Sequence, residues 1–174
     1  MKKSGFALGL WAALASTPAA AAEPCLSTSE AEDLTVFLMP SLMEGFARKC
    51  SPYLPADAAL KTVGPDMARR YRPEADTAWP RAKLAFAKIS GKDMPPFLSD
   101  EVTRQVMAEA GSAGVINEVP TKDCGLVDRF IDALAPLPPR NMGKLFAILM
   151  EVGAKDEKSA SASPLRLCAT LASR

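Results

Sequence analysis

The residue type with the clearest chemistry in this chain is cysteine, which occurs four times, and no histidine accompanies it. No two of Cys25, Cys50, Cys124 and Cys168 are spaced as a Cys-x-x-Cys motif, so the spacings typical of redox and zinc sites are missing. The lack of histidine excludes His-based catalytic triads and haem attachment of the Cys-x-x-Cys-His type. In an exported chain, an even number of cysteines indicates two disulfides.

Four cysteines allow three pairings, and helix geometry weakens one of them. Residues 27–49 form a predicted helix about 30 Å long, with Cys25 and Cys50 at its two ends. A disulfide needs Cα atoms within about 7 Å, which disfavours Cys25–Cys50. Two pairings stay open. We favour Cys25–Cys168 with Cys50–Cys124, because chain termini often lie close together.

A group of cations around Tyr71 has the composition of an anion or phosphate site. Carboxylates are interleaved with these cations and are available to pair with them, so we interpret the group as a solvated, self-neutralised surface. The cations are Arg69, Arg70, Arg72, Arg81 and Lys83, and the carboxylates are Asp66, Glu74 and Asp76.

Other candidate chemistry is weaker still. Met39 and Met43 are four residues apart, and thioethers suit Cu(I), but methionine more often fills a core. The carboxylate pairs Glu30 with Asp33 and Asp128 with Asp132 fall on single helix faces, whereas glycoside hydrolysis needs two carboxylates across a cleft. The chain has no Gly-x-Ser-x-Gly elbow. We therefore assign no catalytic, cofactor-binding or metal-binding residue.

The N-terminus has the three regions of a secretory signal peptide. Lys2 and Lys3 precede an apolar run over residues 5–14, and Ala20-Ala21-Ala22 offers a small-x-small cleavage site before Glu23. The apolar run is too short to span a bilayer, which takes about 20 residues. We predict export to the bacterial periplasm, with cleavage after Ala22 or one residue earlier.

Helical periodicity dominates the remaining chain, which predicts an all-α bundle of five to seven short helices, some kinked by proline. A capping box, Ser27-x-x-Glu30, opens the first helix. Residues 65–71 and 73–90 are expected as separate helices, and a helix from residue 99 or 100 to about 110 should face Val102, Val106 and Met107 inward. The helix expected over 141–153, capped by Asn141, is apolar nearly all round and should be the most buried.

These elements predict a signal peptide over 1–22, a single helical domain over 23–153, and a flexible tail over 154–174 that Cys168 ties back. The core should contain seven large apolar residues from four helices. They are Phe37, Phe86, Leu126, Phe130, Ile131, Phe146 and Leu149.

The formal net charge of +1 argues against a nucleic-acid partner, because phosphate binding requires a basic excess. The mature chain has no apolar run long enough to cross a membrane. With no catalytic motif, the preferred hypothesis is a non-enzymatic binding or interaction protein, whose partner, a protein or an apolar small molecule, the sequence does not identify. The alternatives are a carrier of an apolar small molecule in the helical core and a hydrolase with paired carboxylates.

Overall fold

The computed structural model describes residues 25–91, 99–154 and 167–168. Within these ranges the chain forms six α-helices and two short 3₁₀-helices, and the only β-type contact is an isolated bridge between Leu26 and Leu167. The helices are α1 (Thr28–Cys50), η1 (Ser51–Tyr53), α2 (Ala59–Thr62), α3 (Gly64–Ser90), α4 (Asp100–Glu118), η2 (Thr121–Asp123), α5 (Cys124–Leu134) and α6 (Pro139–Ala154). The predicted all-α class is confirmed. The signal peptide and most of the predicted tail lie outside the described residues.

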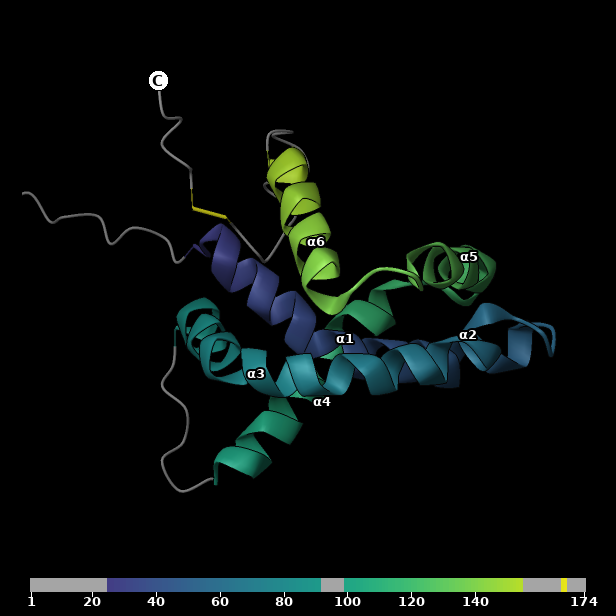
Figure 1. The fold of residues 1–174 in the computed structure, drawn as a ribbon, viewed down its shortest axis with the longest axis horizontal. Helices are drawn as coiled ribbons and strands as arrows, with labels where there is room; N and C mark the ends of the chain where they lie inside the picture. Colours follow the sequence, from purple (N-terminus) through teal and green to yellow (C-terminus); the bar gives the residue numbers. More distant parts are fainter. Residues whose placement is uncertain (1–24, 92–98, 155–166, 169–174) are drawn as a thin grey trace, which may run out of the picture.

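Helix α1 is the central element, and α3, α4 and α6 all pack against it (Figure 1). Its start follows the predicted capping box. The Glu30 backbone N–H donates to Ser27 Oγ at 3.3 Å, and Glu30 Oε2 accepts from the Ser27 N–H at 2.7 Å. Pro40 lies inside the helix and is buried. In Figure 1, α1 changes direction near its middle, as expected where proline removes a backbone hydrogen bond.

Helix α3 is continuous over Gly64–Ser90, so the predicted division into two helices is wrong. Pro73 and Pro80 both face solvent. Water can satisfy the carbonyls that they free, and α3 curves around α1 without breaking. The buried residues of its second half are mostly alanines, including Ala78, Ala82 and Ala85, which let α3 pack closely. Gly91 ends the helix with φ of 61°, a left-handed conformation that favours glycine.

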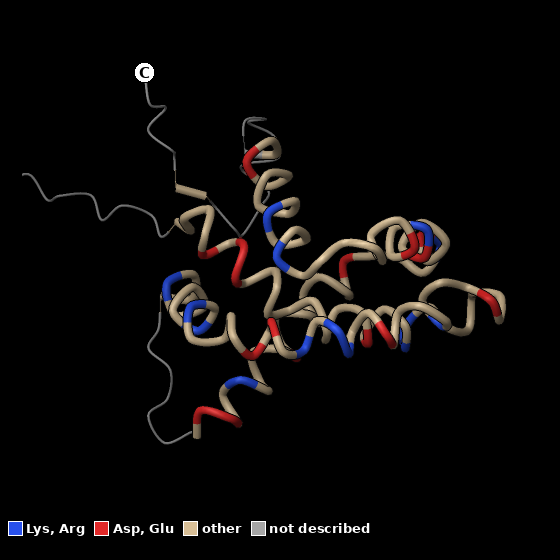
Figure 2. Tube along the Cα trace, in the orientation of Figure 1, with Lys and Arg blue, Asp and Glu red and all other residues tan. Residues whose placement is uncertain are grey.

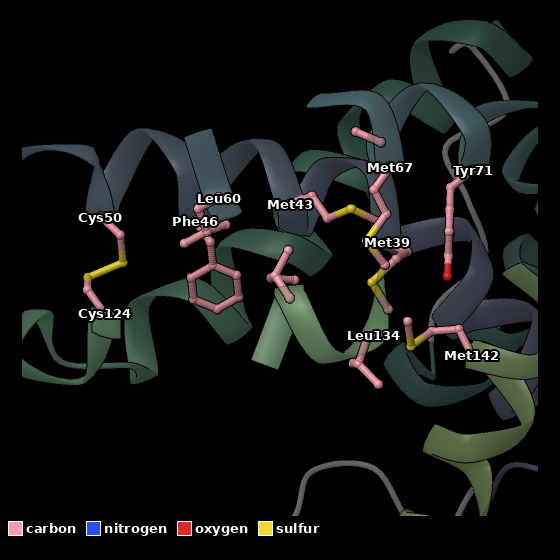
Figure 3. Close-up of a cluster of buried hydrophobic side chains, with 12 residues drawn as sticks. Met39, Met43, Phe46, Cys50, Leu60, Met67, Tyr71, Cys124, Leu134 and Met142 are labelled. Atoms are coloured by element: carbon pink, nitrogen blue, oxygen red, sulfur yellow. A yellow bond between two sulfur atoms is a disulfide. The ribbon is translucent and has the colours of Figure 1, made fainter. Parts of the chain in front are cut away.

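The apolar interior has two parts. Around the first half of α1, the Phe37 ring lies 5.0 Å from Trp79 and 6.1 Å from Phe86, centroid to centroid. The second part fills the space between the rest of α1 and the other helices (Figure 3). Its fully buried Tyr71 donates its hydroxyl to the Leu137 carbonyl at 3.0 Å. Burial, only partly opposed by the charge of Arg70, raises the pKa of Tyr71 to about 12.

Both disulfides have the pairing that the sequence favoured. Cys25 and Cys168 have Cα atoms 4.8 Å apart, and Cys50 and Cys124 have Cα atoms 5.4 Å apart. The Cys25–Cys168 disulfide joins the segment before α1 to residues 167–168. Beside it, the Cys168 N–H donates to the Leu26 carbonyl at 2.7 Å. The second connects the end of α1 to the start of α5 (Figure 3).

Helix α4 extends to Glu118, eight residues beyond its predicted end, and exposes Val102 and Val106, which were predicted to face inward. Gly111 and Gly114 do not end it. Gly111 has a packing role, because a Cβ at this position would come within 2.8 Å of Leu38 and 2.9 Å of Phe86. The close approach of α4 to α1 therefore depends on the missing side chain.

The prediction for the last two helices was partly wrong. Helix α6 begins at Pro139 rather than behind an Asn141 cap, and it is not the most buried element. Of the predicted core, Phe37 and Ile131 are buried and Phe86 and Phe146 are half-buried. The remaining three are exposed: Leu126, Phe130 and Leu149. An apolar pattern identifies a face that avoids water, but α5 and α6 have more apolar surface than the other helices cover.

Candidate functional site

The predicted cation group does not converge on an anion site. All five cations lie on α3, and each has a partner either one turn away on the same helix or on another segment of the chain. Arg69 pairs with Asp66, Arg72 with Glu44, Arg81 with Asp33 and Lys83 with Asp100, while Arg70 donates to the Ala135 carbonyl at 2.7 Å. The cations are thus paired, but of the interleaved carboxylates only Asp66 pairs within the group, while Glu74 pairs with Arg140 and Asp76 with Arg104.

One carboxylate, Asp33, is buried, with 3% of its surface exposed. Arg140 Nη1 donates to Asp33 Oδ1 at 2.8 Å, and Arg81 Nη2 donates to the same oxygen at 2.9 Å. Burial disfavours the charged carboxylate, but the hydrogen bonds and charges of Arg81 and Arg140 outweigh it and lower the pKa of Asp33. Arg140 also binds Glu74 through Nε at 2.9 Å. This cluster joins α1, α3 and α6, and each group in it has a partner.

The predicted carboxylate pairs do not form acid–base sites. Glu30 is committed to the α1 cap and to Lys88, whose ammonium lies 2.9 Å away. Asp128 accepts from the Leu60 backbone N–H at 2.7 Å, and Asp132 is exposed on α5. Among the described residues, no group of three or more His, Cys, Asp or Glu side chains is placed to hold a metal ion.

Met39 and Met43 lie in the apolar interior together with Met67 and Met142, contributed by α1, α3 and α6 (Figure 3). All four are at most 4% exposed. Flexible thioether side chains fill the irregular space where these three helices meet, which is the packing role expected of methionine.

A groove of about 1020 Å³ lies along α1, between α3 and α4. It exists because α4 packs mainly on α1 and touches α3 little. Asp100 holds the start of α4 by accepting from Trp79 Nε1 at 2.7 Å. Lys49 holds its end by donating to the Ile116 and Val119 carbonyls at 2.6 and 2.5 Å. A Cβ on Gly45 would overlap Ile116, so this glycine lets the end of α4 lie close against α1.

Eight of the nineteen lining residues of this groove are charged, four acidic and four basic. They are Glu44, Asp76, Glu101, Glu109, Arg48, Lys49, Arg72 and Arg104. Such a lining does not suit an apolar small molecule, which requires a mostly hydrophobic pocket. The groove therefore gives no support to the carrier alternative.

A second candidate surface is the apolar band of α5 and α6, which comprises Leu126, Phe130, Phe146, Ile148, Leu149 and Val152. Five of these are between 42% and 60% exposed, and Phe146 is half-buried. The Phe130 and Phe146 rings meet edge to face at 6.1 Å and join the two helices. Leu126 and Phe130 are four residues apart on α5, and Phe146, Leu149 and Val152 are each three apart on α6, so these members adjoin on their helix. The two rings connect the apolar residues of α5 with those of α6.

Charges of both signs lie near the band. Lys122, Arg129 and Lys144 lie within one helical turn of it and have no ion pair among the described residues. The nearby carboxylates are Asp123, Asp128, Asp132 and Glu151. Of these, Asp128 accepts from the Leu60 backbone N–H and Glu151 accepts from Thr28 Oγ1 at 2.9 Å. Figure 2 shows how few charges α6 carries beyond the two cations near its start.

The fold and these surfaces define an all-α, disulfide-bonded protein. No protein-family model matches the chain, and no curated protein and no solved structure is significantly similar to it. None of the helices in the described ranges is both long enough and apolar enough to cross a membrane.

Sequence reasoning missed both surfaces. The groove results from the angle at which α4 crosses α1, and Gly45 and Gly111 are its only local signs. The band was visible as an apolar pattern, but that pattern was assigned to the core.

Proposed function

We propose that this protein is exported to the bacterial periplasm and acts there as a non-enzymatic interaction protein, which binds a partner protein through the apolar band of α5 and α6. The observation that carries the proposal is the exposure of that band. Single exposed apolar residues are common, but a continuous patch with polar neighbours marks an interaction site. The paired rings of Phe130 and Phe146 would form its centre, since aromatic side chains dominate binding energy at interfaces.

The partner segment we propose is an amphipathic helix with acidic residues beside its apolar face. A helix would match the band because its apolar residues recur at intervals of three and four, as those of α5 and α6 do. Its carboxylates would meet Lys122, Arg129 and Lys144, which have no ion pair of their own in the described part of the chain. Such complementarity chiefly sets the association rate and the choice of partner.

A binding experiment with a defined probe tests this surface. The probe is a synthetic helical peptide with leucines at intervals of three and four and flanking glutamates, and its control is the same composition scrambled. We expect Phe130→Asp with Leu149→Asp to weaken probe binding at least tenfold. Leu84→Asp is the matched control, because Leu84 is 67% exposed on α3, away from the band. Equal loss with Leu84→Asp, or no binding by the wild type, would refute the proposal.

Two further measurements on the same protein distinguish the other possible binding partners of the band, a second copy of the chain and a membrane. A second copy of the chain would double the mass in analytical ultracentrifugation, and the Phe130→Asp, Leu149→Asp variant would return it to a monomer. An anionic membrane would retain the protein on vesicles that contain phosphatidylglycerol, but not on neutral ones. Dimerisation or vesicle binding, in a protein that does not bind the probe, would contradict the proposal of a helical protein partner.

Export is supported by the signal-like residues 1–22, and the two disulfides fit a protein that folds outside the reducing cytosol. N-terminal sequencing of the protein from a periplasmic extract should begin at Glu23 or Ala22. A soluble, disulfide-bonded protein that begins at Met1 would contradict this part of the proposal.

A further inference from the structure

Six of the eight charged residues in the groove are already engaged. Glu44 pairs with Arg72 across α1 and α3, Arg104 pairs with Asp76 and Glu101, and Lys49 binds two carbonyls of α4. The two that remain are Arg48 on α1 and Glu109 on α4. Both are exposed. Arg48 has no ion pair among the described residues, and Glu109 has only the Gln105 amide as a donor, at 3.2 Å. The groove thus offers one free cation and one free anion.

These two charges are separated along the groove. Arg48 and Ile116 both adjoin Gly45, and Arg48 Nη2 would lie 3.9 Å from a Cβ placed there. Glu109 is seven residues before Ile116 on α4, and at 1.5 Å per residue this places it about 10 Å from the level of Arg48. A ligand that satisfies both must therefore carry an anion and a cation about 10 Å apart.

A polypeptide in the polyproline II conformation has this geometry. It rises 3.1 Å per residue with three residues per turn, so side chains at positions i and i+3 lie on the same side about 9 Å apart. In a β-strand, residues three apart point to opposite faces. The stretch of α1 that lines the groove, from Phe37 to Lys49, is about 18 Å long and accommodates about six such residues.

The other properties of the groove favour the same ligand class. Its volume of about 1020 Å³ is at the upper end of the range for small-molecule sites. Equal numbers of acidic and basic lining residues do not suit the phosphates of a nucleic acid, which require a basic excess. Ala108 and Ile116, which are half-buried, add apolar contact surface to the groove.

We propose that the groove between α3 and α4 binds an extended segment of another polypeptide, in polyproline II conformation, that carries an acidic and a basic residue three positions apart. The acidic residue pairs with Arg48 and the basic residue with Glu109. The site is separate from the apolar band, and either can exist without the other.

Selection from a library of random twelve-residue peptides tests this proposal on the mature, disulfide-bonded protein. We expect enrichment of peptides with opposite charges three positions apart. Fluorescence anisotropy with an enriched, fluorescein-labelled peptide should show at least tenfold weaker binding to Arg48→Glu. Exchange of the peptide's acidic residue for lysine should restore most of the lost affinity to that variant. Arg70→Glu is the matched control, because it changes the net charge equally at an exposed site on α3 that lines neither the groove nor the apolar band, and it should alter affinity less than twofold.

Three results would overturn the proposal: no enriched peptide, charge spacings other than three, or binding that Arg48→Glu and Arg70→Glu weaken equally. A spacing of seven would identify a helical ligand instead, since seven helical residues also span about 10 Å. Ala113→Trp provides an independent check, because Ala113 is exposed and lines the groove. The indole should fill the groove and abolish binding while circular dichroism shows an unchanged helical fold.

Discussion

Arg140 and Asp33 are 107 residues apart in the sequence, yet Arg140 Nη1 donates a hydrogen bond to Asp33 Oδ1 at 2.8 Å. The contact joins the start of α6 to α1, and Arg81 of α3 binds the same carboxylate. Asp33 is the only buried acidic residue in the described part of the chain. Its charge is balanced by Arg81 of α3 and Arg140 of α6, two helices that otherwise touch each other little.

Replacement of Asp33 should destabilise the protein in a pH-dependent way. Because the folded pKa of Asp33 is lowered, its contribution to stability is complete above the unfolded pKa of about 3.9 and is lost as the pH falls through the folded value. We expect Asp33→Asn to reduce the free energy of unfolding by about 1–3 kcal/mol at pH 7, the scale of hydrogen bonds to a charged group. Urea denaturation at pH 7 and at pH 3 measures the difference.

The comparison must be made between variants, since the pKa of Glu30 is also lowered, by Ser27 and Lys88 against the effect of burial. Some acid sensitivity will therefore remain in Asp33→Asn, but its difference from the wild type should shrink toward pH 3. Asp66→Asn serves as the control, because Asp66 pairs only with exposed Arg69. It should change stability by less than about 0.5 kcal/mol. A pH-independent penalty for Asp33→Asn would show that packing, not charge, explains the effect.

Phe130 and Ile131 are adjacent residues with opposite environments. Ile131 is 5% exposed in the core, whereas Phe130 is 42% exposed and touches Phe146 at its edge. We expect Ile131→Ala to cost about 2–5 kcal/mol, and Phe130→Ala only about 1 kcal/mol, mostly from the lost ring contact. Chemical denaturation of both variants measures the order, and a larger loss for Phe130→Ala would mean that the apolar band is covered within the monomer.

Replacing Gly143 and Gly114 with alanine should change the stability of the protein in opposite directions. A Cβ on Gly143 would lie 2.9 Å from the Glu32 carbonyl oxygen and 2.9 Å from Val36 Cγ2, where α6 crosses α1. Gly143→Ala should therefore cost about 1–3 kcal/mol through overpacking. At Gly114, inside α4, nothing lies within 4 Å, so Gly114→Ala should stabilise by about 0.5–1 kcal/mol. Thermal unfolding of the two variants should give melting temperatures on opposite sides of the wild type.

Local signals in the sequence identified several helix ends, although not the start of α6. Ser27 with Glu30, Ser99 and Gly91 mark real helix ends, because capping depends on residues within one turn. Pro73 and Pro80 did not end α3, because packing against α1 holds the whole face together and leaves both prolines toward solvent. Local propensity alone could not reveal that compensation.

Exposure was harder to predict because it depends on how many neighbours the fold supplies. Leu126 and Leu149 belong to apolar patterns that are typical of core helices, and the sequence does not show that α5 and α6 lie at the edge of the fold. The groove has the same cause. Arg48 and Glu109 are 61 positions apart in the chain, and only the crossing of α4 over α1 places them in one hollow.

The two disulfides should contribute unequally to stability. In the chain-entropy model, closing the 74-residue separation between Cys50 and Cys124 contributes about 4.5 kcal/mol. Both cysteines are at most 1% exposed and connect two helices of the apolar interior, so native packing keeps them fixed. We expect the Cys50→Ser, Cys124→Ser variant to lose about that much, enough to unfold a marginal domain.

The Cys25–Cys168 bridge closes a larger separation of 143 residues, yet we expect its removal to cost less. Its described surroundings on the Cys168 side are the Leu26–Leu167 bridge, one hydrogen bond from Cys168 to Leu26, and the packing of half-buried Leu167 at the edge of the apolar cluster. Without the disulfide, this contact can open while α1 to α6 stay packed, so the native state also gains freedom and the entropic difference shrinks. Urea denaturation of both double-serine variants, with non-reducing peptide mapping of the wild type, measures the order. A greater loss on removing Cys25–Cys168 would mean that the contact with residues 167–168 forms part of the cooperative core.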